Sequence, residues 1–321
     1  MYTTYGSKRL WQAVIVLGLV LALLALGMIG TAYADEGAPV VGGAGGAGEA
    51  AGAATSEAAS EPAAETTTIE PAVPNPSYYR LFLSTANGGA IGNLSYSDED
   101  VLSYKPSTGQ WVKTFDGTNA GLPAAADVDA FAYRFEGITS YLYMSFTEPT
   151  AVPGLGAVDD SDVVVYQVTL AGATWAMVFD GSQHGLTTAA EDVDGLELAA
   201  DGELILSTAG NFSVPGHTGN TVSGGDETLI RFVGNSFHVQ YDALSSGLAA
   251  NNDVTSLAYE YGGEGESYYL VTARPYNLPG AAGAAGTVLL RIEATYGSDS
   301  NTLWWQTQTV NKIDAFDLKI E

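Results

Sequence analysis

The sequence predicts an all-β fold, and more specifically a four-bladed β-propeller formed by residues 78–321. Three observations carry this prediction: short segments rich in β-branched and aromatic residues, glycine-containing turns between them, and a repeat of about 60 residues that occurs four times. Each repeat offers four strand-like segments. Four strands per unit with radial repetition is typical of a β-propeller, although the same pattern allows a pair of β-sandwiches or an open solenoid.

Aligned series of segments define the repeat. In the first series the hydroxyl residues are 61, 62 and 65 positions apart, at Ser84, Ser145, Ser207 and Thr272. The segments of the second series are 65, 61 and 59 positions apart, and they begin at Asp127, Asp192, Asp253 and Lys312. Two further series are weak in the last repeat. Because the series keep in step along the chain, we interpret them as the strands of four similar units.

The order of the segments predicts that the units close into a ring. The domain begins with the second strand of a unit, at residues 81–85, and it ends with the first strand of a unit, at residues 313–320. The first unit is therefore complete only if the two ends of the domain pair. Such a pairing leaves no open gap in the ring.

The long loops are predicted to share one rim of the propeller, because the short glycine-containing turns alternate with them along the chain. Binding residues are common on such loops above a rigid scaffold. The rim is acidic, and we predict a binding face formed by Asp98, Asp100, Asp116, Asp127, Asp160, Asp162, Asp180, Asp192, Asp226 and Asp253. The alternative is that these aspartates only cap local N–H groups or turn the chain.

The mouth of the central channel is the strongest single candidate site. Asp129, Asp194 and Asp314 occupy the same place on three predicted inner strands, and Thr255 occupies it on the fourth. Crowded carboxylates repel one another at neutral pH, and a hard cation with six to eight oxygen ligands relieves that repulsion. The four residues therefore predict a Ca²⁺ site, although no loop matches the helix-loop-helix calcium pattern.

Composition narrows the function. The formal net charge of −26 leaves no basic stripe for phosphates, so we expect no nucleic-acid partner. The absence of cysteine excludes disulfides, thiol catalysis and cysteine metal sites. None of the common catalytic motifs is present, and His184 and His217 are expected to be solvated loop residues. We expect a non-catalytic module that binds an extracellular protein or glycan; a secreted glycoside hydrolase or lyase that uses the rim carboxylates is the alternative.

The N-terminal region predicts export. Residues 1–34 combine Lys8 and Arg9 with an apolar run at 13–29 and a small-x-small motif that ends at Ala34, as in a signal peptide. The run also reaches the lower limit for a membrane span, so an uncleaved anchor is the alternative and the only expected membrane contact. Residues 35–77 have the composition of a disordered linker. We therefore expect the domain outside the cell or at its surface.

Two resemblances follow from these motifs. The recurring Leu-x-Leu-Ser, Asp-Glu-Asp-Val, Phe-Asp-Gly and Asp-Val-Asp-Ala patterns resemble those of uncharacterised secreted bacterial repeat proteins over nearly all of residues 78–321. This resemblance implies no activity. The architecture is also similar to the four-bladed hemopexin domain, whose inner strands carry an Asp-Ala pair such as Asp129-Ala130 or Asp314-Ala315. The units of this chain are longer and the hemopexin Tyr-Trp-Arg signature is absent, so the likeness is one of fold only.

Overall fold

The computed structural model describes residues 79–320 except for 263–264, 274–275, 279–280, 284–289, 294–298 and 303–312. The predicted signal or anchor at 1–34 and the predicted linker at 35–77 lie outside the described residues. Within the described ranges, no helix has the length and apolar character needed to cross a membrane.

The described residues form four antiparallel sheets of four strands each, and the strands of each sheet are named below from the innermost outward. The first sheet contains β24 (Ile313–Ile320), β1 (Tyr79–Thr85), β4 (Val101–Lys105) and β5 (Gln110–Phe115). The second sheet contains β6 (Ala130–Glu136), β7 (Thr139–Ser145), β10 (Val163–Thr169) and β11 (Gly172–Phe179). The third sheet contains β12 (Gly195–Leu198), β13 (Leu204–Ser207), β16 (Thr228–Val233) and β17 (Ser236–Asp242). The fourth sheet contains β18 (Val254–Gly262), β19 (Gly265–Thr272), β22 (Leu290–Glu293) and β23 (Asp299–Thr302).

Each repeat also carries a small two-stranded hairpin between its second and third strands. The four hairpins are β2–β3 (Gly89–Ile91, Leu94–Tyr96), β8–β9 (Thr150–Val152, Gly156–Val158), β14–β15 (Phe212–Pro215, Thr221–Gly224) and β20–β21 (Tyr276–Leu278, Ala281–Gly283). Short 3-10 helices lie in the loops, at η2 (Gly181–His184), η3 (Ala189–Glu191), η4 (His217–Gly219) and η5 (Ala243–Ser246).

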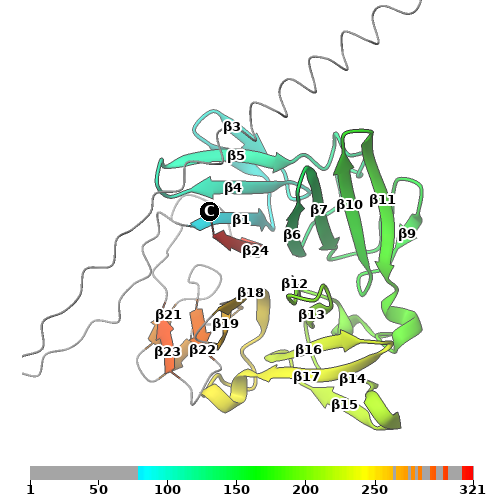
Figure 1. Cartoon of the computed structure of the whole chain (residues 1–321), viewed down its shortest axis with the longest axis vertical. Helices are drawn as coiled ribbons and strands as arrows, with labels where there is room; N and C mark the ends of the chain where they lie inside the picture. The colour runs from blue at the N-terminus through cyan, green and yellow to red at the C-terminus, as the bar shows by residue number, and fades with distance from the viewer. Residues whose placement is uncertain are drawn as a thin grey trace, which may run out of the picture. The chain divides into compact units, whose positions relative to one another are not determined.

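The two ends of the described chain meet in the first sheet. Strand β1 pairs with β24 in antiparallel register, with Leu81 opposite Leu318 and Leu83 opposite Phe316. The innermost strands of the four sheets surround a common centre (Figure 1), and β24 and β12 each contact both β6 and β18. The N-terminal strand therefore completes a sheet whose inner strand comes from the other end of the chain.

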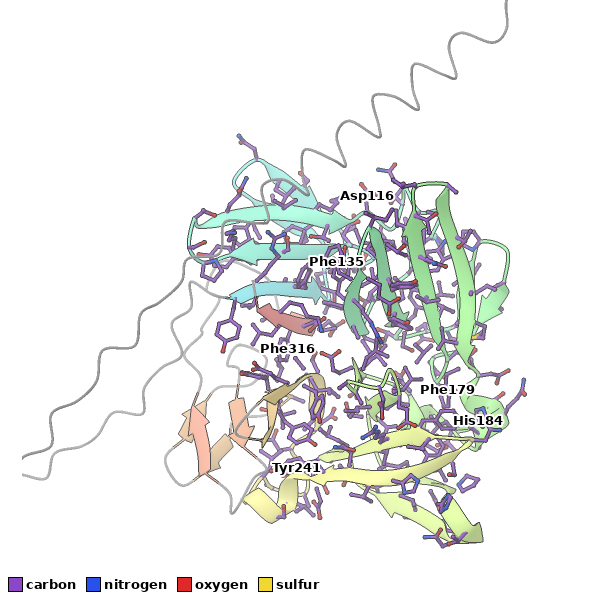
Figure 2. The ribbon with its side chains drawn as sticks, viewed as in Figure 1. Asp116, Phe135, Phe179, His184, Tyr241 and Phe316 are labelled. Atoms are coloured by element: carbon purple, nitrogen blue, oxygen red, sulfur yellow. The ribbon has the colours of Figure 1, made fainter. Side chains whose placement is uncertain are left out.

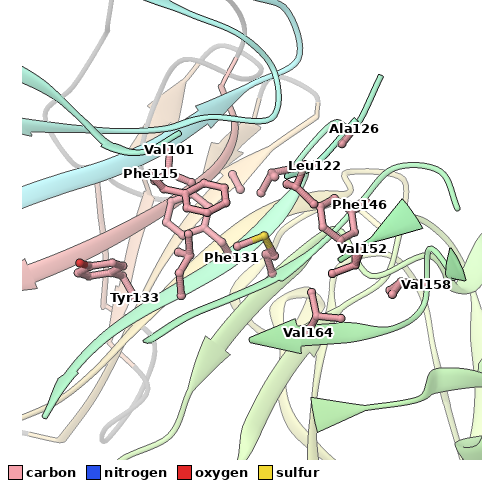
Figure 3. Packing of buried hydrophobic residues seen from close by; sticks show 14 of the residues in the cluster. Val101, Phe115, Leu122, Ala126, Phe131, Tyr133, Phe146, Val152, Val158 and Val164 are labelled. Atoms are coloured by element: carbon pink, nitrogen blue, oxygen red, sulfur yellow. The ribbon is translucent and has the colours of Figure 1, made fainter. Parts of the chain in front are cut away.

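The core consists of four apolar clusters, each between two neighbouring sheets. Strand β6 shows how one strand serves two clusters: Phe131 and Tyr133 pack against the first sheet (Figure 3), whereas Ala130 and Ala132 pack against the third. This division follows from the alternation of side chains along a strand. Burial of one large side chain contributes about 1.5–3 kcal/mol, so these interfaces account for much of the stability.

Two of the repeated hydroxyl residues join one sheet to the next, whereas Ser145 Oγ donates to the carbonyl oxygens of Asp160 and Asp162 in its own repeat. Ser84 Oγ donates to the carbonyl oxygen of Val128 at 2.6 Å, and Ser207 Oγ donates to that of Val254 at 2.8 Å. Each serine lies at or next to the end of the second strand of one sheet. Val128 lies two residues before β6 of the next sheet, and Val254 is the first residue of β18. At these two junctions the repeated hydroxyl residue therefore bonds to the start of the following repeat.

Candidate functional site: an acidic pocket between the inner strands

The four residues predicted at the channel mouth lie together. Asp129 and Asp194 directly precede β6 and β12, and Thr255 and Asp314 are the second residues of β18 and β24. They line one pocket of about 260 Å³, which we call the upper pocket. The described residues that line it are Ala86, Asp127, Asp129, Thr147, Asp192, Asp194, Thr255 and Asp314. The pocket is thus lined by one residue at, or directly before, the start of each of the four inner strands.

A repeated backbone hydrogen bond holds the loops that enter the upper pocket. The carbonyl oxygen of Asp127 accepts from Thr147 N at 3.1 Å, that of Asp192 accepts from Ala209 N at 2.9 Å, and that of Asp253 accepts from Ala273 N at 2.9 Å. In three repeats this first aspartate therefore has a fixed backbone, and its side chain and that of the residue two positions later are on the same side of the chain.

Two aspartates of the upper pocket are almost completely buried. Asp129 is 6% exposed and Asp194 is 8% exposed. Burial raises the pKa of Asp129 well above its usual range, and the charges of Asp192 and Asp314 raise it further. Burial is also the main reason that the pKa of Asp194 is raised, followed by the charges of Asp253 and Asp129. The carboxyl groups are therefore close enough to oppose one another's ionisation.

The two outer aspartates of the pocket show the same effect at smaller scale. Burial, together with the charges of Asp314 and Asp98, raises the pKa of Asp127 to about 7. Burial, together with the charge of Asp160 and other nearby acids, raises the pKa of Asp192 to about 8. Without a compensating cation, ionising this cluster at neutral pH is costly.

Several oxygens around the pocket are buried without a hydrogen-bond partner. They are Oδ1 of Asp127, Oδ1 of Asp129, Oδ1 of Asp192 and Oγ1 of Thr255. By contrast, Asp194 Oδ1 accepts from Ser207 Oγ at 3.1 Å. An unsatisfied buried polar group costs about 1–3 kcal/mol, so four of them around one pocket call for a specific explanation.

Four other aspartates of the predicted binding face accept from nearby backbone N–H groups. Asp100 accepts from Ser97 N at 2.9 Å and from Gly117 N at 3.0 Å. Its equivalent, Asp162, accepts from Asp159 N at 2.9 Å and from Gly181 N at 2.9 Å. These carboxylates accept hydrogen bonds from backbone N–H groups of the turns on which they lie, as expected if their role is to cap local N–H groups.

Asp116 and Asp180 follow the same local pattern. Asp116 Oδ1 accepts from Asn119 N at 2.9 Å, and Asp180 Oδ1 accepts from Gln183 N at 3.1 Å at the start of η2. The residue after each of them is a glycine, and at Gly181 space requires it, because a Cβ there would lie 2.3 Å from the carbonyl oxygen of Ser161. The recurring Phe-Asp-Gly motif is therefore a turn with an aspartate cap.

The remaining predicted acids lie next to the upper pocket without lining it. The carbonyl oxygens of Asp98, Asp160 and Asp226 accept from the backbone N–H groups of the residues at 128, 193 and 254, at 3.2, 3.2 and 3.0 Å. Asp253, the equivalent of Asp127 and Asp192, adds to the field that raises the pKa of Asp194. The predicted face thus separates into local caps and a set of acids around one pocket.

A second group of buried charges lies toward the other end of the inner strands, and sequence reasoning missed it. A pocket of about 400 Å³, which we call the lower pocket, is lined by Tyr133, Arg134, Phe135, Glu197, Leu198, Ala199, Ala200 and Lys319. Glu197 and Asp317 are 1% and 0% exposed. The repeat could have revealed this group. Glu197 and Asp317 each follow an aligned aspartate by three positions, where the other two repeats have Ala132 and Ala258.

The histidines do not come together as a metal site. His184 stacks on Phe179 with ring centroids 5.2 Å apart (Figure 2), whereas His217 lies beside His238 with centroids 5.4 Å apart. The two loop histidines singled out by the sequence therefore have different neighbours.

Comparisons with known proteins give no family. No family model matches the chain, and no curated protein matches it.

Among solved structures, YjhT matches with a TM-score of 0.28 and 11% identity over 65% of this chain and 52% of its own. A nidogen/laminin complex matches with a TM-score of 0.36 and 10% identity over 75% of this chain and 97% of its own. A GH43 protein, BlXynB from Bacillus licheniformis, matches with a TM-score of 0.33 and 11% identity over 74% of this chain and 59% of its own. The chain spans about half the length of YjhT, and scores this low carry no assignment of fold or function.

Proposed function

We propose that residues 78–321 form a closed four-bladed propeller. The antiparallel pairing of β1 with β24 supports closure, because it joins the two ends of the described chain within one sheet. The four apolar clusters give further support, since each fills a junction between neighbouring sheets. In this arrangement the upper pocket lies on the propeller axis.

The function that this geometry supports best is cation binding by an exported, non-catalytic interaction module. The single observation that carries it is the buried, unpartnered oxygen of Asp129, which lines a pocket together with four other aspartates and two threonines. Carboxylate and hydroxyl oxygens are the ligands that Ca²⁺ prefers, and Ca²⁺ tolerates the irregular geometry of such a cluster. A bound cation makes ionisation of these acids favourable and satisfies their oxygens.

The donor set fits Ca²⁺, but the side chains are not drawn together on one point. Within the described part of the chain, no three Asp, Glu, His or Cys side chains have the spacing of a formed metal site. Mutual repulsion between carboxylates favours such separation when no cation is bound. In the proposal, binding turns the aspartate side chains toward the pocket centre, and backbone carbonyls or waters complete the shell.

In this proposal the N-terminal segment acts as an export signal and the module works at or outside the cell surface, with an extracellular protein or glycan as its partner. Ca²⁺ commonly keeps free coordination positions that a second molecule can fill with its own oxygens. The pocket lies among the long loops, which are the usual place for binding residues. A cation bound in the upper pocket could therefore be coordinated by oxygens of the partner as well as by those of this chain.

Isothermal titration calorimetry tests this function. Calcium added to protein stripped with a chelator should give a saturable heat with about one site per chain. Asp129→Asn should weaken that binding at least tenfold, because it removes a charged ligand, whereas Asp180→Asn alters a local cap outside the pocket and should leave it unchanged. A protein that gives no calcium heat, or two variants that respond alike, would contradict the assignment.

Carbohydrate cleavage is the second candidate, and it draws on the same pocket. Its supporting observation is that Asp127 and Asp192 have pKa values raised to about 7 and about 8, the range of a general acid. Incubation with a panel of polysaccharides, followed by measurement of released reducing ends, distinguishes the two functions. Turnover that is lost in Asp192→Asn and kept in Asp180→Asn would favour the enzyme.

A further inference from the structure

The lower pocket is lined by two cations in a protein that has few of them. The sequence has 11 Lys and Arg against 37 Asp and Glu, yet both Arg134 and Lys319 line this one pocket. Arg134 belongs to β6 and Lys319 to β24, two inner strands that contact each other. Their side chains are 37% and 34% exposed, so both cations are accessible to a dissolved ligand.

The acids that pair with these cations do not line the pocket. Lys319 Nζ lies 3.0 Å from Oδ1 of Asp317. Asp317 is fully buried, and its Oδ2 accepts from Tyr133 N at 2.8 Å. Arg134 Nη2 lies 2.9 Å from Oε1 of Glu136. Neither Asp317 nor Glu136 is among the described residues that line the pocket, so the two ion pairs present their positive ends to it.

Glu197 is the acid that lines the pocket, and near neutral pH it is mainly uncharged. Burial, together with the charge of Asp317, raises its pKa to about 8. A protonated carboxyl group is a hydrogen-bond donor, so Glu197 does not repel an anion there. Glu260 of β18 occupies the position equivalent to Arg134, but its Oε2 accepts from Tyr269 Oη at 2.8 Å and it is not among the described lining residues.

An apolar wall completes the lower pocket. Phe135 is 64% exposed (Figure 2), and its ring lies edge-on to that of Tyr133 with centroids 4.8 Å apart. The other apolar lining residues are Leu198, Ala199 and Ala200. A mostly apolar lining with a few polar groups is typical of small-molecule sites, which range from about 300 to 1,000 Å³. At about 400 Å³ this pocket suits a small ligand.

We propose that the lower pocket binds a small organic carboxylate whose acid group is attached to a ring. The carboxylate lies between Arg134 and Lys319, because charge-assisted hydrogen bonds from cations to carboxylates are the strong ones. The ring lies against Phe135, and the carboxyl group of Glu197 donates a further hydrogen bond. Sugar acids and aromatic acids share this chemistry. The site is separate from the upper pocket, and the proposal does not depend on calcium binding there.

Titrations followed by the NMR signals of the ligand test this proposal. Glucuronate and benzoate serve as probes, and excess chelator keeps the upper pocket free of calcium. At least one of the two acids should bind saturably, and the tighter of them identifies the kind of ring. The neutral counterparts, glucose and benzyl alcohol, should bind about tenfold more weakly, because they lack the charged hydrogen bonds.

Matched variants complete the experiment. Arg134→Met leaves no buried charge behind and should weaken carboxylate binding about tenfold, and Phe135→Ala should weaken it by a smaller factor. Lys113→Met removes the same charge from β5, and Asp129→Asn alters the upper pocket; both should leave carboxylate binding unchanged. Lys319 is kept, because its loss leaves two buried acids without a cation.

The proposal is overturned if neither acid binds, or if the neutral counterparts bind as tightly as the acids. It is also overturned if Arg134→Met and Lys113→Met affect binding equally. Circular dichroism of each variant confirms that a loss of binding does not reflect unfolding.

Discussion

Acidic side chains are buried at both the upper and the lower ends of the inner strands, but only those at the lower end have hydrogen-bond donors and a cation beside them. At the lower end, Asp317 Oδ2 accepts from Tyr133 N of β6 at 2.8 Å, and Glu197 Oε2 accepts from Tyr259 N of β18 at 3.5 Å. Lys319 Nζ lies 3.0 Å from Asp317 and 3.3 Å from Glu197. At the upper end, Asp129 has an oxygen with no partner, and no cationic side chain of the described residues lines the pocket.

The protonation of the lower group follows from this arrangement. Burial and the charge of Asp317 raise the pKa of Glu197 to about 8 even though Lys319 opposes the shift. Burial acts against the charge of Lys319, but Asp317 and Glu197 outweigh it and hold the lysine pKa above its usual value. Near neutral pH Glu197 is therefore mainly protonated, and it lies beside the ammonium group of Lys319. Both groups of acids are buried, so burial does not distinguish them. The presence of a cationic side chain beside the acids is what distinguishes a structural charge cluster from a candidate cation site.

The largest expected effect comes from breaking the lower group. Lys319→Met leaves two buried carboxyl groups without their cation, and we expect a loss of about 3–5 kcal/mol in the free energy of unfolding. Arg134 is the matched control, because it occupies the equivalent position on β6 and only pairs with exposed Glu136. Arg134→Met should cost at most about 1 kcal/mol. Urea unfolding of both variants checks the difference, and equal losses would remove the distinction between the two ends.

Calcium should act on the upper end with the next largest effect. At a free concentration about 100 times the dissociation constant, a ligand that binds only the folded state adds about 2.7 kcal/mol of stability. For a domain of this size, that corresponds to a rise of roughly 5–10 °C in melting temperature. Differential scanning calorimetry with calcium and then with excess chelator measures it. A melting temperature that calcium leaves unchanged would contradict the proposed site.

Asp129→Asn tests the upper pocket by removing one of its negative charges. In chelator at pH 8 the wild-type pocket contains carboxylates that repel one another, so a neutral amide at this position should stabilise the protein by about 1–2 kcal/mol. The same change should remove the stabilisation by calcium. The equivalent test at the lower end, Glu197→Gln, should respond to neither condition. Calorimetry of the variants in chelator and in calcium gives all the required values.

The pH dependence should be the smallest effect. A carboxyl group whose folded pKa is raised stabilises the fold at acidic pH, and this contribution is lost as the pH rises through the folded pKa. Asp127 and Asp192 place that loss between about pH 4 and pH 8. Because both are only partly buried, solvent screening limits each contribution to about 1 kcal/mol. Melting temperatures in chelator should therefore fall from pH 5 to pH 8.5, and calcium should flatten the decline.

The repeat predicted much of the strand order and the upper pocket, because equivalent positions in a repeat occupy equivalent places in the sheets. Asp129, Asp194, Thr255 and Asp314 line one pocket for this reason. The same reasoning did not separate Asp100 and Asp162 from the pocket acids, since an aspartate that caps a turn and one that faces the axis look alike in a sequence. Only their hydrogen bonds distinguish them.

Departures from the repeat were harder to interpret. Glu197 and Asp317 replace alanine in two of the four units, and Lys319 stands two residues after Asp317. Their role depends on which strands face each other across the centre, which no single strand specifies.

Proton release on calcium binding tests the central claim most directly. If the upper aspartates are partly protonated for want of a cation, calcium must displace protons when it binds. Weakly buffered wild-type protein at pH 7 should therefore acidify in proportion to the calcium bound and should stop at saturation. Calcium that binds without releasing protons, or that fails to bind, would contradict the account of an uncompensated upper pocket.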